Sequence, residues 1–164
     1  ISHWLTLPDI APGVSLFADD TALLCSNACP IRLHEAMQDS IGKVITWMHD
    51  WKLQPNVDKT AAMYISPSPP SLPLCFPSSS VAIRIVEEHK HLGVIIDSKL
   101  SWSPHVQYVC KRTSSILGAL QAHCRHLPLS CKRLFYRCYI LPLLDYCDTA
   151  WCGITTTVLN KLET

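Results

Sequence analysis

The sequence lacks the signals that would assign its 164 residues to a membrane or to a secretory route. Only 16% of the residues are charged, yet no run of 18 apolar residues is free of charge. A membrane-spanning helix needs about 20 such residues, so we expect no membrane segment. No basic stretch followed by an apolar run opens the chain, so we expect no secretory signal. The first residue is Ile1 rather than Met, and we expect a segment of a longer polypeptide.

Regular cysteine spacing is also missing, although the chain has nine cysteines. No Cys-x-x-Cys pair occurs, and no histidine and cysteine spacing typical of zinc sites is present. A disulfide framework belongs to secreted proteins, for which the sequence gives no indication. We therefore expect reduced cysteines that are buried as small apolar side chains.

Charge is distributed unevenly although the net charge is only +1. Residues 84–137 contain nine lysines and arginines against three acidic residues, whereas residues 1–83 contain four against seven. A compact basic block of this kind indicates a surface that faces phosphates, with a solvated helix face as the alternative. Hydrophobic residues make up 48% of the chain, which excludes a disordered tail and supplies the core of one domain.

Hydrophobic patterns predict a hairpin and a helix in the first third of the chain. Residues 14–17 and 21–25 are typical of short strands, and Ala18, Asp19 and Asp20 lie between them as an acidic tip. Apolar residues then recur at helical spacing over about five turns. These residues are Leu33, Met37, Ile41, Val44, Ile45, Met48 and Trp51.

The remaining chain predicts further strands and then helices. A strand is expected over residues 61–65, followed by an irregular proline- and serine-rich excursion over 66–80. Residues 81–86 and 92–96 suggest a second hairpin, interrupted by charged residues. Helical periodicity begins at Ser103 and returns over residues 129–141, with an end or a kink at Pro142.

These patterns predict an α+β fold in two parts. Residues 1–101 would form hairpins packed on an amphipathic helix, and residues 102–164 would form a helical region, with the boundary near Trp102.

The adjacent carboxylates of Asp19 and Asp20 are the strongest chemical signal. Neighbouring residues in a strand point to opposite faces, so the two carboxylates can share a site only where the backbone turns. Two like charges repel unless a cation neutralises them, and Mg²⁺ prefers oxygen ligands. The simple alternative is a solvated Asp-Asp turn without a metal.

At this point the sequence resembles a known family, the reverse transcriptases of non-LTR (LINE-type) retrotransposons. Phe17-Ala18-Asp19-Asp20 resembles the aromatic-x-Asp-Asp hairpin of the polymerase palm. The helix and turn that follow this hairpin in the family resemble residues 47–53 with 56–60. The family's primer-grip hairpin resembles residues 91–97, and its helical thumb resembles Trp102, 105–106, 141–147 and Trp151. These segments occur in the family's order. The resemblance covers roughly residues 10–155 and implies a partial palm followed by a thumb-like subdomain.

The resemblance implies two-metal phosphoryl transfer to a primer 3′-hydroxyl, with Mg²⁺ or Mn²⁺ as the cofactor. Asp19 would be a direct metal ligand and Asp20 the second carboxylate. Ala18 would leave room for the primer terminus, while Phe17 would support the tip. Lys59 matches the lysine that protonates departing pyrophosphate, with an ordinary exposed lysine as the alternative.

The same resemblance places Leu92 and Gly93 beside the primer, where a glycine lets the backbone approach closely; a simple bulge glycine is the alternative. Five cations of the helical region would bind duplex phosphates without reading sequence. These are Lys111, Arg112, Lys132, Arg133 and Arg137, of which Arg133 and Arg137 share one helical face.

The implied partners are an RNA template, a DNA primer, deoxynucleoside triphosphates and the rest of a parent polyprotein, in the nucleus and cytoplasm. The family's third carboxylate, expected on an earlier strand, and its fingers have no counterpart before Phe17, so we expect the isolated chain to be inactive. One alternative is a degenerate or repurposed module that binds nucleic acid or protein without catalysis. Another is an unrelated metal-dependent hydrolase that uses Asp19 and Asp20.

Overall fold

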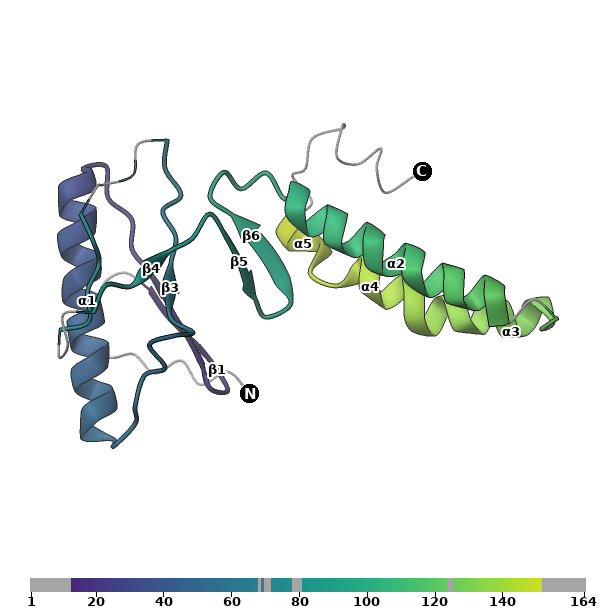
Figure 1. The fold of residues 1–164 in the computed structure, drawn as a ribbon, viewed down its shortest axis with the longest axis horizontal. Helices are drawn as coiled ribbons and strands as arrows, with labels where there is room; N and C mark the ends of the chain where they lie inside the picture. Colours follow the sequence, from purple (N-terminus) through teal and green to yellow (C-terminus); the bar gives the residue numbers. More distant parts are fainter. Residues whose placement is uncertain (1–12, 68, 70–71, 78–80, 124–125, 152–164) are drawn as a thin grey trace. The chain divides into compact units, whose positions relative to one another are not determined.

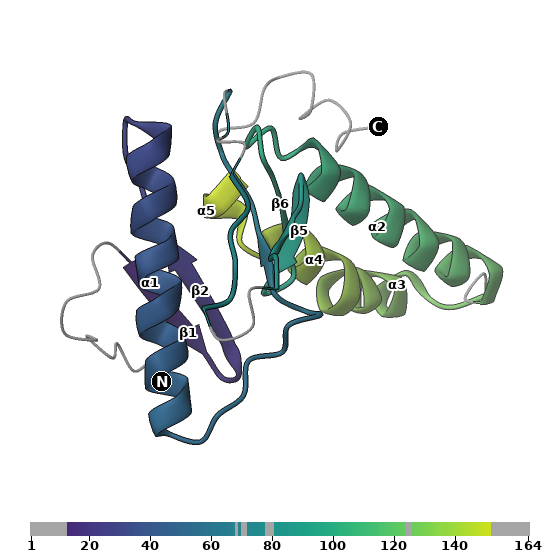
Figure 2. The same cartoon turned by 60° about the vertical axis from the view of Figure 1, so that its left-hand side comes forward.

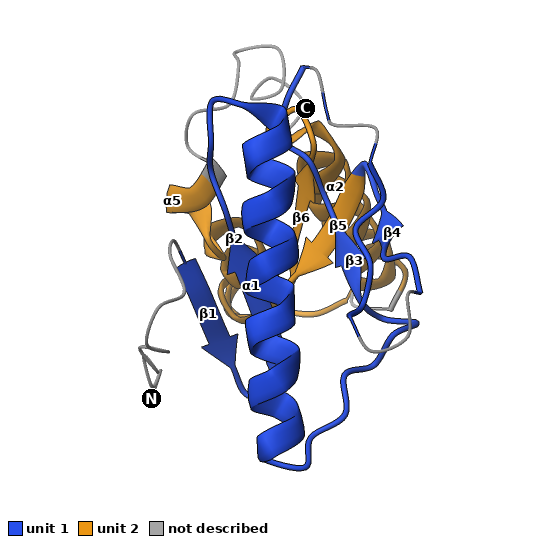
Figure 3. Ribbon diagram, turned by 90° about the vertical axis from the view of Figure 1, so that its left-hand side faces the viewer, with its two compact units in different colours: residues 1–87 blue, residues 88–164 orange. Residues whose placement is uncertain are grey.

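The computed structural model describes residues 13–67, 69, 72–77, 81–123 and 126–151. The chain divides into two compact units, residues 1–87 and residues 88–164 (Figure 3). In the first unit a long helix accompanies two-stranded sheets, and in the second unit several helices accompany a two-stranded sheet. The predicted α+β class is therefore confirmed. The two units are described separately below.

The acidic hairpin of the first unit has the predicted position. Strands β1 (Gly13–Phe17) and β2 (Asp20–Leu24) pair antiparallel, with Phe17 opposite Asp20 and Gly13 opposite Leu24. Only Ala18 and Asp19 join the strands. A two-residue connection is the shortest that antiparallel strands use, and it fixes the register of the whole hairpin.

Helix α1 (Pro30–Asp50) packs along this hairpin, as Figure 2 shows. Pro30 lies in the first turn, where its missing N–H removes no helical hydrogen bond. The apolar face predicted from the periodicity is the face that the structure buries, with Ile41 and Val44 nearly inaccessible. Trp51 is the exception, because it follows the last residue of α1 and is 68% exposed. Ile41 is part of a core cluster that also includes Leu74 and Phe76.

The proline- and serine-rich stretch is irregular, as predicted, but it also supplies part of the core. Leu74 and Phe76 are 1% and 5% exposed, respectively. The side-chain amide of Gln38 on α1 holds the segment between them: its Nε2 donates to the Cys75 carbonyl at 2.7 Å, and its Oε1 accepts from the Cys75 N–H at 3.0 Å. Apolar residues separated by prolines show no helical or strand period, so their burial cannot be predicted from the sequence pattern.

The second hairpin differs from the prediction. Strand β4 (Arg84–Ile85) pairs in parallel with β3 (Ala61–Ala62), and it does not join the next strand in a hairpin. The hairpin consists instead of β5 (Glu88–His91) and β6 (Val94–Asp97). The charged residues that were expected to interrupt the hairpin are therefore its first strand. Their side chains are mostly exposed on β5, while Val94 on β6 is buried. An antiparallel hairpin can leave one side in solvent, and a strand of polar residues is stable there.

The helices of the second unit follow the predicted order. Helix α2 (Ser103–His123) lies along a second helical run, as Figure 1 shows for α2 and α4. That run consists of α3 (Leu129–Phe135), the π-helix η1 (Tyr136–Ile140) and α4 (Leu141–Asp145), and a short α5 (Asp148–Trp151) follows. The predicted kink at Pro142 takes the form of this π segment. Proline offers no N–H to the carbonyl of Cys138, and a widened turn accommodates that loss.

The boundary between the units lies between Glu87 and Glu88, rather than near Trp102 as the sequence suggested. Contacts between the hairpin and α2 explain the difference. The carboxylate of Asp97, at the end of β6, accepts N–H bonds from Ser101 at 3.0 Å and Trp102 at 2.9 Å. Nδ1 of buried His105 accepts the Ile95 N–H at 3.3 Å. Hairpin β5–β6 and α2 therefore form one compact body.

Two further expectations concern cysteines and membranes. None of the described cysteines is buried, so the expectation of buried thiols is wrong for these residues: Cys25, Cys29, Cys75, Cys110, Cys131, Cys138 and Cys147. Among the helices that the structure describes, none has both the length and the apolar character that crossing a bilayer requires.

His105 should make the stability of this fold depend on pH. Burial of the imidazole lowers its pKa, and the positive charge of Lys90 lowers the pKa further. In the unfolded chain the His105 imidazole is half protonated at about pH 6.5, whereas in the folded protein it takes up a proton only at lower pH. The free energy of unfolding should therefore be highest above about pH 7 and fall as the pH drops below about 6.5.

Denaturant unfolding between about pH 8 and pH 5 would measure this dependence. The variant His105→Gln should be less stable at the upper pH and should lose less stability on acidification. Identical pH profiles for both proteins would show that His105 is not the source.

Candidate functional site

The two carboxylates lie at the tip of the β1–β2 hairpin, and both are exposed. Ala18 has a φ of 52°, in the left-handed region, so the chain reverses direction at this residue and at Asp19. Asp20 is the first residue of β2 and stands opposite Phe17, whose side chain is 59% exposed. The turn therefore brings adjacent carboxylates to one accessible end of the hairpin, as the sequence predicts.

These carboxylates have the donor chemistry of a magnesium site but supply only part of a ligand set. Carboxylate oxygens are hard ligands, and Mg²⁺ retains positions for water and phosphate oxygens. In the part of the chain that the structure describes, no group of three or more His, Cys, Asp or Glu side chains lies together as a metal site. The residues present fit a cation that takes further ligands from elsewhere.

Lys59 is exposed in a turn of the same unit, and Asn56 organises that turn. The Asn56 side-chain oxygen accepts the Lys59 N–H at 3.1 Å. The Asn56 carbonyl accepts both the N–H and the hydroxyl of Thr60, at 3.0 and 2.7 Å. Three bonds to one residue fix the backbone that carries the lysine, while its ammonium group extends into solvent.

In the second unit, Leu92 and Gly93 form the two-residue tip of the β5–β6 hairpin. Their φ angles are 47° and 91°, both in the left-handed region, as in a type I′ turn. Glycine adopts such a φ without strain, so the turn itself requires Gly93 whether or not a primer lies nearby. The bulge that was the alternative explanation for Gly93 is not what the register shows.

The predicted cations lie on the helices of the second unit. Lys111 and Arg112 are exposed on α2, Arg133 is exposed on α3, and Arg137 is exposed on η1. Lys132 on α3 is half-buried. Arg133 and Arg137 remain about one turn apart although the helix changes type between them.

Lys90 extends this basic surface, and the sequence analysis missed it. Its ammonium lies 4.6 Å from the ring centre of Tyr108 and donates to the Tyr108 hydroxyl at 3.2 Å. Arg112 donates to the same hydroxyl at 2.9 Å. The bond from Arg112 and then that from Lys90 lower the pKa of Tyr108. Spacing within a helix could have linked Tyr108 to Arg112, but the approach of Lys90 requires the fold of the hairpin on α2.

The site residues are thus divided between the two units. The first unit contains Phe17, Ala18, Asp19, Asp20 and Lys59. The second unit contains the turn at Leu92 and Gly93 and the five predicted cations of the helical region.

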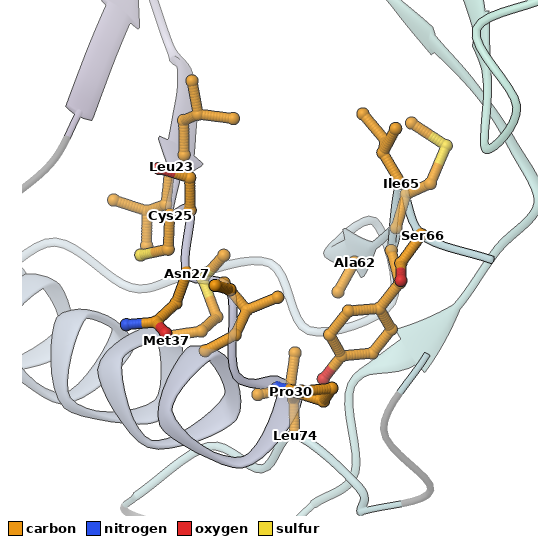
Figure 4. A pocket seen from close by; sticks show the side chains of 15 residues that line it. Leu23, Cys25, Asn27, Pro30, Met37, Ala62, Ile65, Ser66 and Leu74 are labelled. Atoms are coloured by element: carbon orange, nitrogen blue, oxygen red, sulfur yellow. The ribbon is translucent and has the colours of Figure 1, made fainter. Parts of the chain in front are cut away.

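A cavity of about 330 Å³ in the first unit lies apart from the carboxylates. Its wall includes Leu23, at the end of β2 remote from the Asp-Asp tip. Figure 4 shows Leu23 and Cys25 on one side, with Ala62 and Ile65 on the other. The wall is mainly apolar and carries no acidic or basic side chain, so it offers no groups for phosphoryl transfer.

Comparison with known proteins shows what the chain is similar to. It is similar to RNA-directed DNA polymerases of mobile elements, which confirms the resemblance to LINE-type reverse transcriptases seen in its motifs. It is 26% identical over 153 residues to the RNA-directed DNA polymerase from mobile element jockey of Drosophila funebris. The enzyme of the same name from Drosophila melanogaster is 26% identical over 156 residues.

A third relative is the probable RNA-directed DNA polymerase from transposon BS of Drosophila melanogaster, 25% identical over 160 residues. Each match covers 92% of this chain, which spans 17% of the length of each curated relative. No family model matches the chain, and no solved structure matches it.

The left-handed backbone at Ala18 makes a stability test possible. Valine is poorly tolerated at positive φ because it is β-branched, so Ala18→Val should lower the free energy of unfolding by about 1–3 kcal/mol. Ala18→Gly should not destabilise the hairpin, because glycine accepts this φ. Thermal unfolding of both variants would measure the difference. Equal stability of the two variants would contradict the turn described here.

Proposed function

We propose that this chain is the part of a non-LTR retrotransposon reverse transcriptase that contains the Asp-Asp hairpin, the primer-grip hairpin and the helices after it. The observation that carries the proposal is the tip of the β1–β2 hairpin, where a two-residue turn exposes Asp19 beside Asp20. The similarity to mobile-element polymerases across 92% of the chain supports the same assignment. The activity would be RNA-directed DNA synthesis by the longer protein.

Asp19 and Asp20 are the residues that would hold Mg²⁺, or Mn²⁺ in its place. Such an ion supplies charge neutralisation to the primer 3′-hydroxyl and to the triphosphate during phosphoryl transfer. The small side chain of Ala18 leaves space beside the carboxylates, and Phe17 supports the tip from β1. These roles use the exposure of the whole tip, since a buried carboxylate pair would be closed to a primer terminus.

Lys59 would protonate the departing pyrophosphate. A general acid must be held within reach of the oxygen that it protonates, and the Asn56 turn restricts the backbone at Lys59. The long side chain keeps its ammonium in solvent, where a triphosphate could meet it.

The second unit would hold the template and primer duplex. The Leu92–Gly93 turn would contact the primer strand, and the exposed cations of α2, α3 and η1 would bind phosphates. We add Lys90 to this set, because Tyr108 joins it to Arg112 in one basic cluster. Phosphate binding needs no base contacts, so the unit would hold duplexes of any sequence.

Two carboxylates are fewer than the family's three, and we propose that the 164-residue chain does not extend primers by itself. The alternative of a module that binds nucleic acid without catalysis is favoured by one observation: the basic surface lies entirely in the second unit, whereas the carboxylates lie in the first.

Polymerisation by a longer polymerase that contains this segment should depend on Asp19. Asp19→Asn removes one charge from the metal-binding tip and should lower the rate of nucleotide incorporation by about 100- to 1,000-fold, the size of a lost electrostatic contribution. Primer extension on an RNA template would measure the rate. Asp50→Asn, which changes an exposed aspartate of α1, is the matched control and should retain activity. Normal activity of the Asp19 variant would refute the polymerase assignment.

Duplex binding should become less dependent on salt when cations of the second unit are neutralised. Each phosphate contact that is lost should reduce the slope of log affinity against log salt by about one. The double change Arg133→Gln with Arg137→Gln should therefore reduce the slope by about two and weaken all sequences alike. Fluorescence anisotropy with a labelled duplex across a salt series would measure it.

The control for this titration is Arg32→Gln, which neutralises an exposed arginine of α1 in the first unit. Its slope should equal that of the unchanged chain. A slope that stays constant in the double variant would mean that Arg133 and Arg137 face solvent in the complex.

A further inference from the structure

Tyr146, which follows α4, contacts the tip of the β5–β6 hairpin 54 residues earlier in the chain. Its hydroxyl donates a hydrogen bond of 2.6 Å to the carbonyl oxygen of Leu92. Leu92 is the first of the two turn residues, so the bond reaches the backbone at the point where the hairpin reverses.

The ring of Tyr146 also covers the second turn residue. A Cβ atom placed on Gly93 would lie 3.3 Å from Cε1 of Tyr146 and 3.7 Å from both Cζ and the hydroxyl oxygen. A Cβ atom at this position would require the ring to shift by a few tenths of an ångström. Tyr146 therefore contacts both residues of the turn, one through a hydrogen bond and one through its ring.

The turn needs such a contact because its own sequence does not favour its conformation. Type I′ turns are typically Asn-Gly or Asp-Gly, since both residues have positive φ. Here the first position is Leu92 with a φ of 47°, a conformation that a bulky side chain rarely adopts. Strained residues of this kind persist where the surrounding structure fixes them. Tyr146 supplies a contact of this kind from outside the hairpin.

We propose that Tyr146 is a positioning residue, which holds the strained Leu92–Gly93 turn in the place from which it contacts a primer strand. The role of the turn in primer binding rests on the function proposed above, whereas the holding of the turn does not. Through this contact the helical region sets the position of the hairpin tip, and Tyr146 itself need not touch nucleic acid.

Hydrogen exchange tests the holding of the turn in the 164-residue chain. Tyr146→Phe retains the ring but removes the hydrogen bond, and it should speed exchange of the amide protons of Leu92, Gly93 and Val94 by about fivefold, the effect of one net hydrogen bond. The matched control is Tyr139→Phe, at an exposed tyrosine of η1 whose ring stacks on Phe135. The control should leave exchange at the tip unchanged. Unaltered exchange in Tyr146→Phe would overturn the proposal.

A second substitution separates positioning from general packing. Leu92→Asn places at the first turn position a residue that accepts positive φ. In that background the turn needs no external support, so adding Tyr146→Phe should change exchange at the tip much less than it does in the unchanged chain. An equal effect in both backgrounds would mean that Tyr146 merely packs on the unit, and the positioning role would be wrong.

Primer-extension kinetics test the consequence for a longer polymerase that contains this segment. Tyr146→Phe should raise the KM for primer several-fold while leaving kcat within about twofold, since the variant loosens a binding element and leaves the carboxylates intact. An unchanged KM together with faster exchange would overturn the link to primer binding. If the unchanged polymerase extends no primer, the proposed function fails, and the exchange experiment still decides whether Tyr146 holds the turn.

Discussion

A hairpin whose strands are joined by two residues forces its backbone into the left-handed region, and this chain uses that constraint twice. Ala18 adopts it between β1 and β2, and Leu92 with Gly93 adopts it between β5 and β6. The proposed function depends on groups at both turns. The turn between β1 and β2 exposes the carboxylates of Asp19 and Asp20, and the turn between β5 and β6 brings its backbone to the end of the hairpin. The carboxylates of Asp19 and Asp20 would not lie together in a straight strand, because successive side chains of a strand face opposite sides.

The two turns are stabilised in different ways. The first has alanine at its left-handed position, which limits the strain to that of a single Cβ, and its strands pack on α1 nearby in sequence. The second has leucine at the corresponding position and is held by Tyr146, far along the chain. The acidic tip is therefore a local structure, whereas the tip of the second hairpin depends on the complete folding of the helices after it. Asp97 strengthens this dependence, because its carboxylate connects the end of β6 to the start of α2.

The sequence predicted the elements whose side chains repeat at a regular period and missed those fixed by distant contacts. The spacing of Ile41 and Val44 was sufficient to predict the buried face of α1. The burial of Leu74 has no periodic signal, because Gln38 binds the irregular segment beside it from another element. The same limit explains the candidate site. Asp19 and Asp20 are adjacent in sequence and were found, but Lys90 and Tyr146 act across 18 and 54 residues and were not.

The residues of the proposed site are divided between the two units of the chain. The carboxylates and Lys59 belong to one unit, while the Leu92–Gly93 turn and the basic surface belong to the other. The hydrogen bonds of Asp97 with Ser101 and Trp102, of His105 with Ile95 and of Tyr146 with Leu92 all join residues of the second unit. Under the proposed function, loss of the carboxylates would leave these contacts of the second unit in place. In that function, catalysis would depend on groups of the first unit and duplex binding on groups of the second, so substitutions in the two units should affect different measurements.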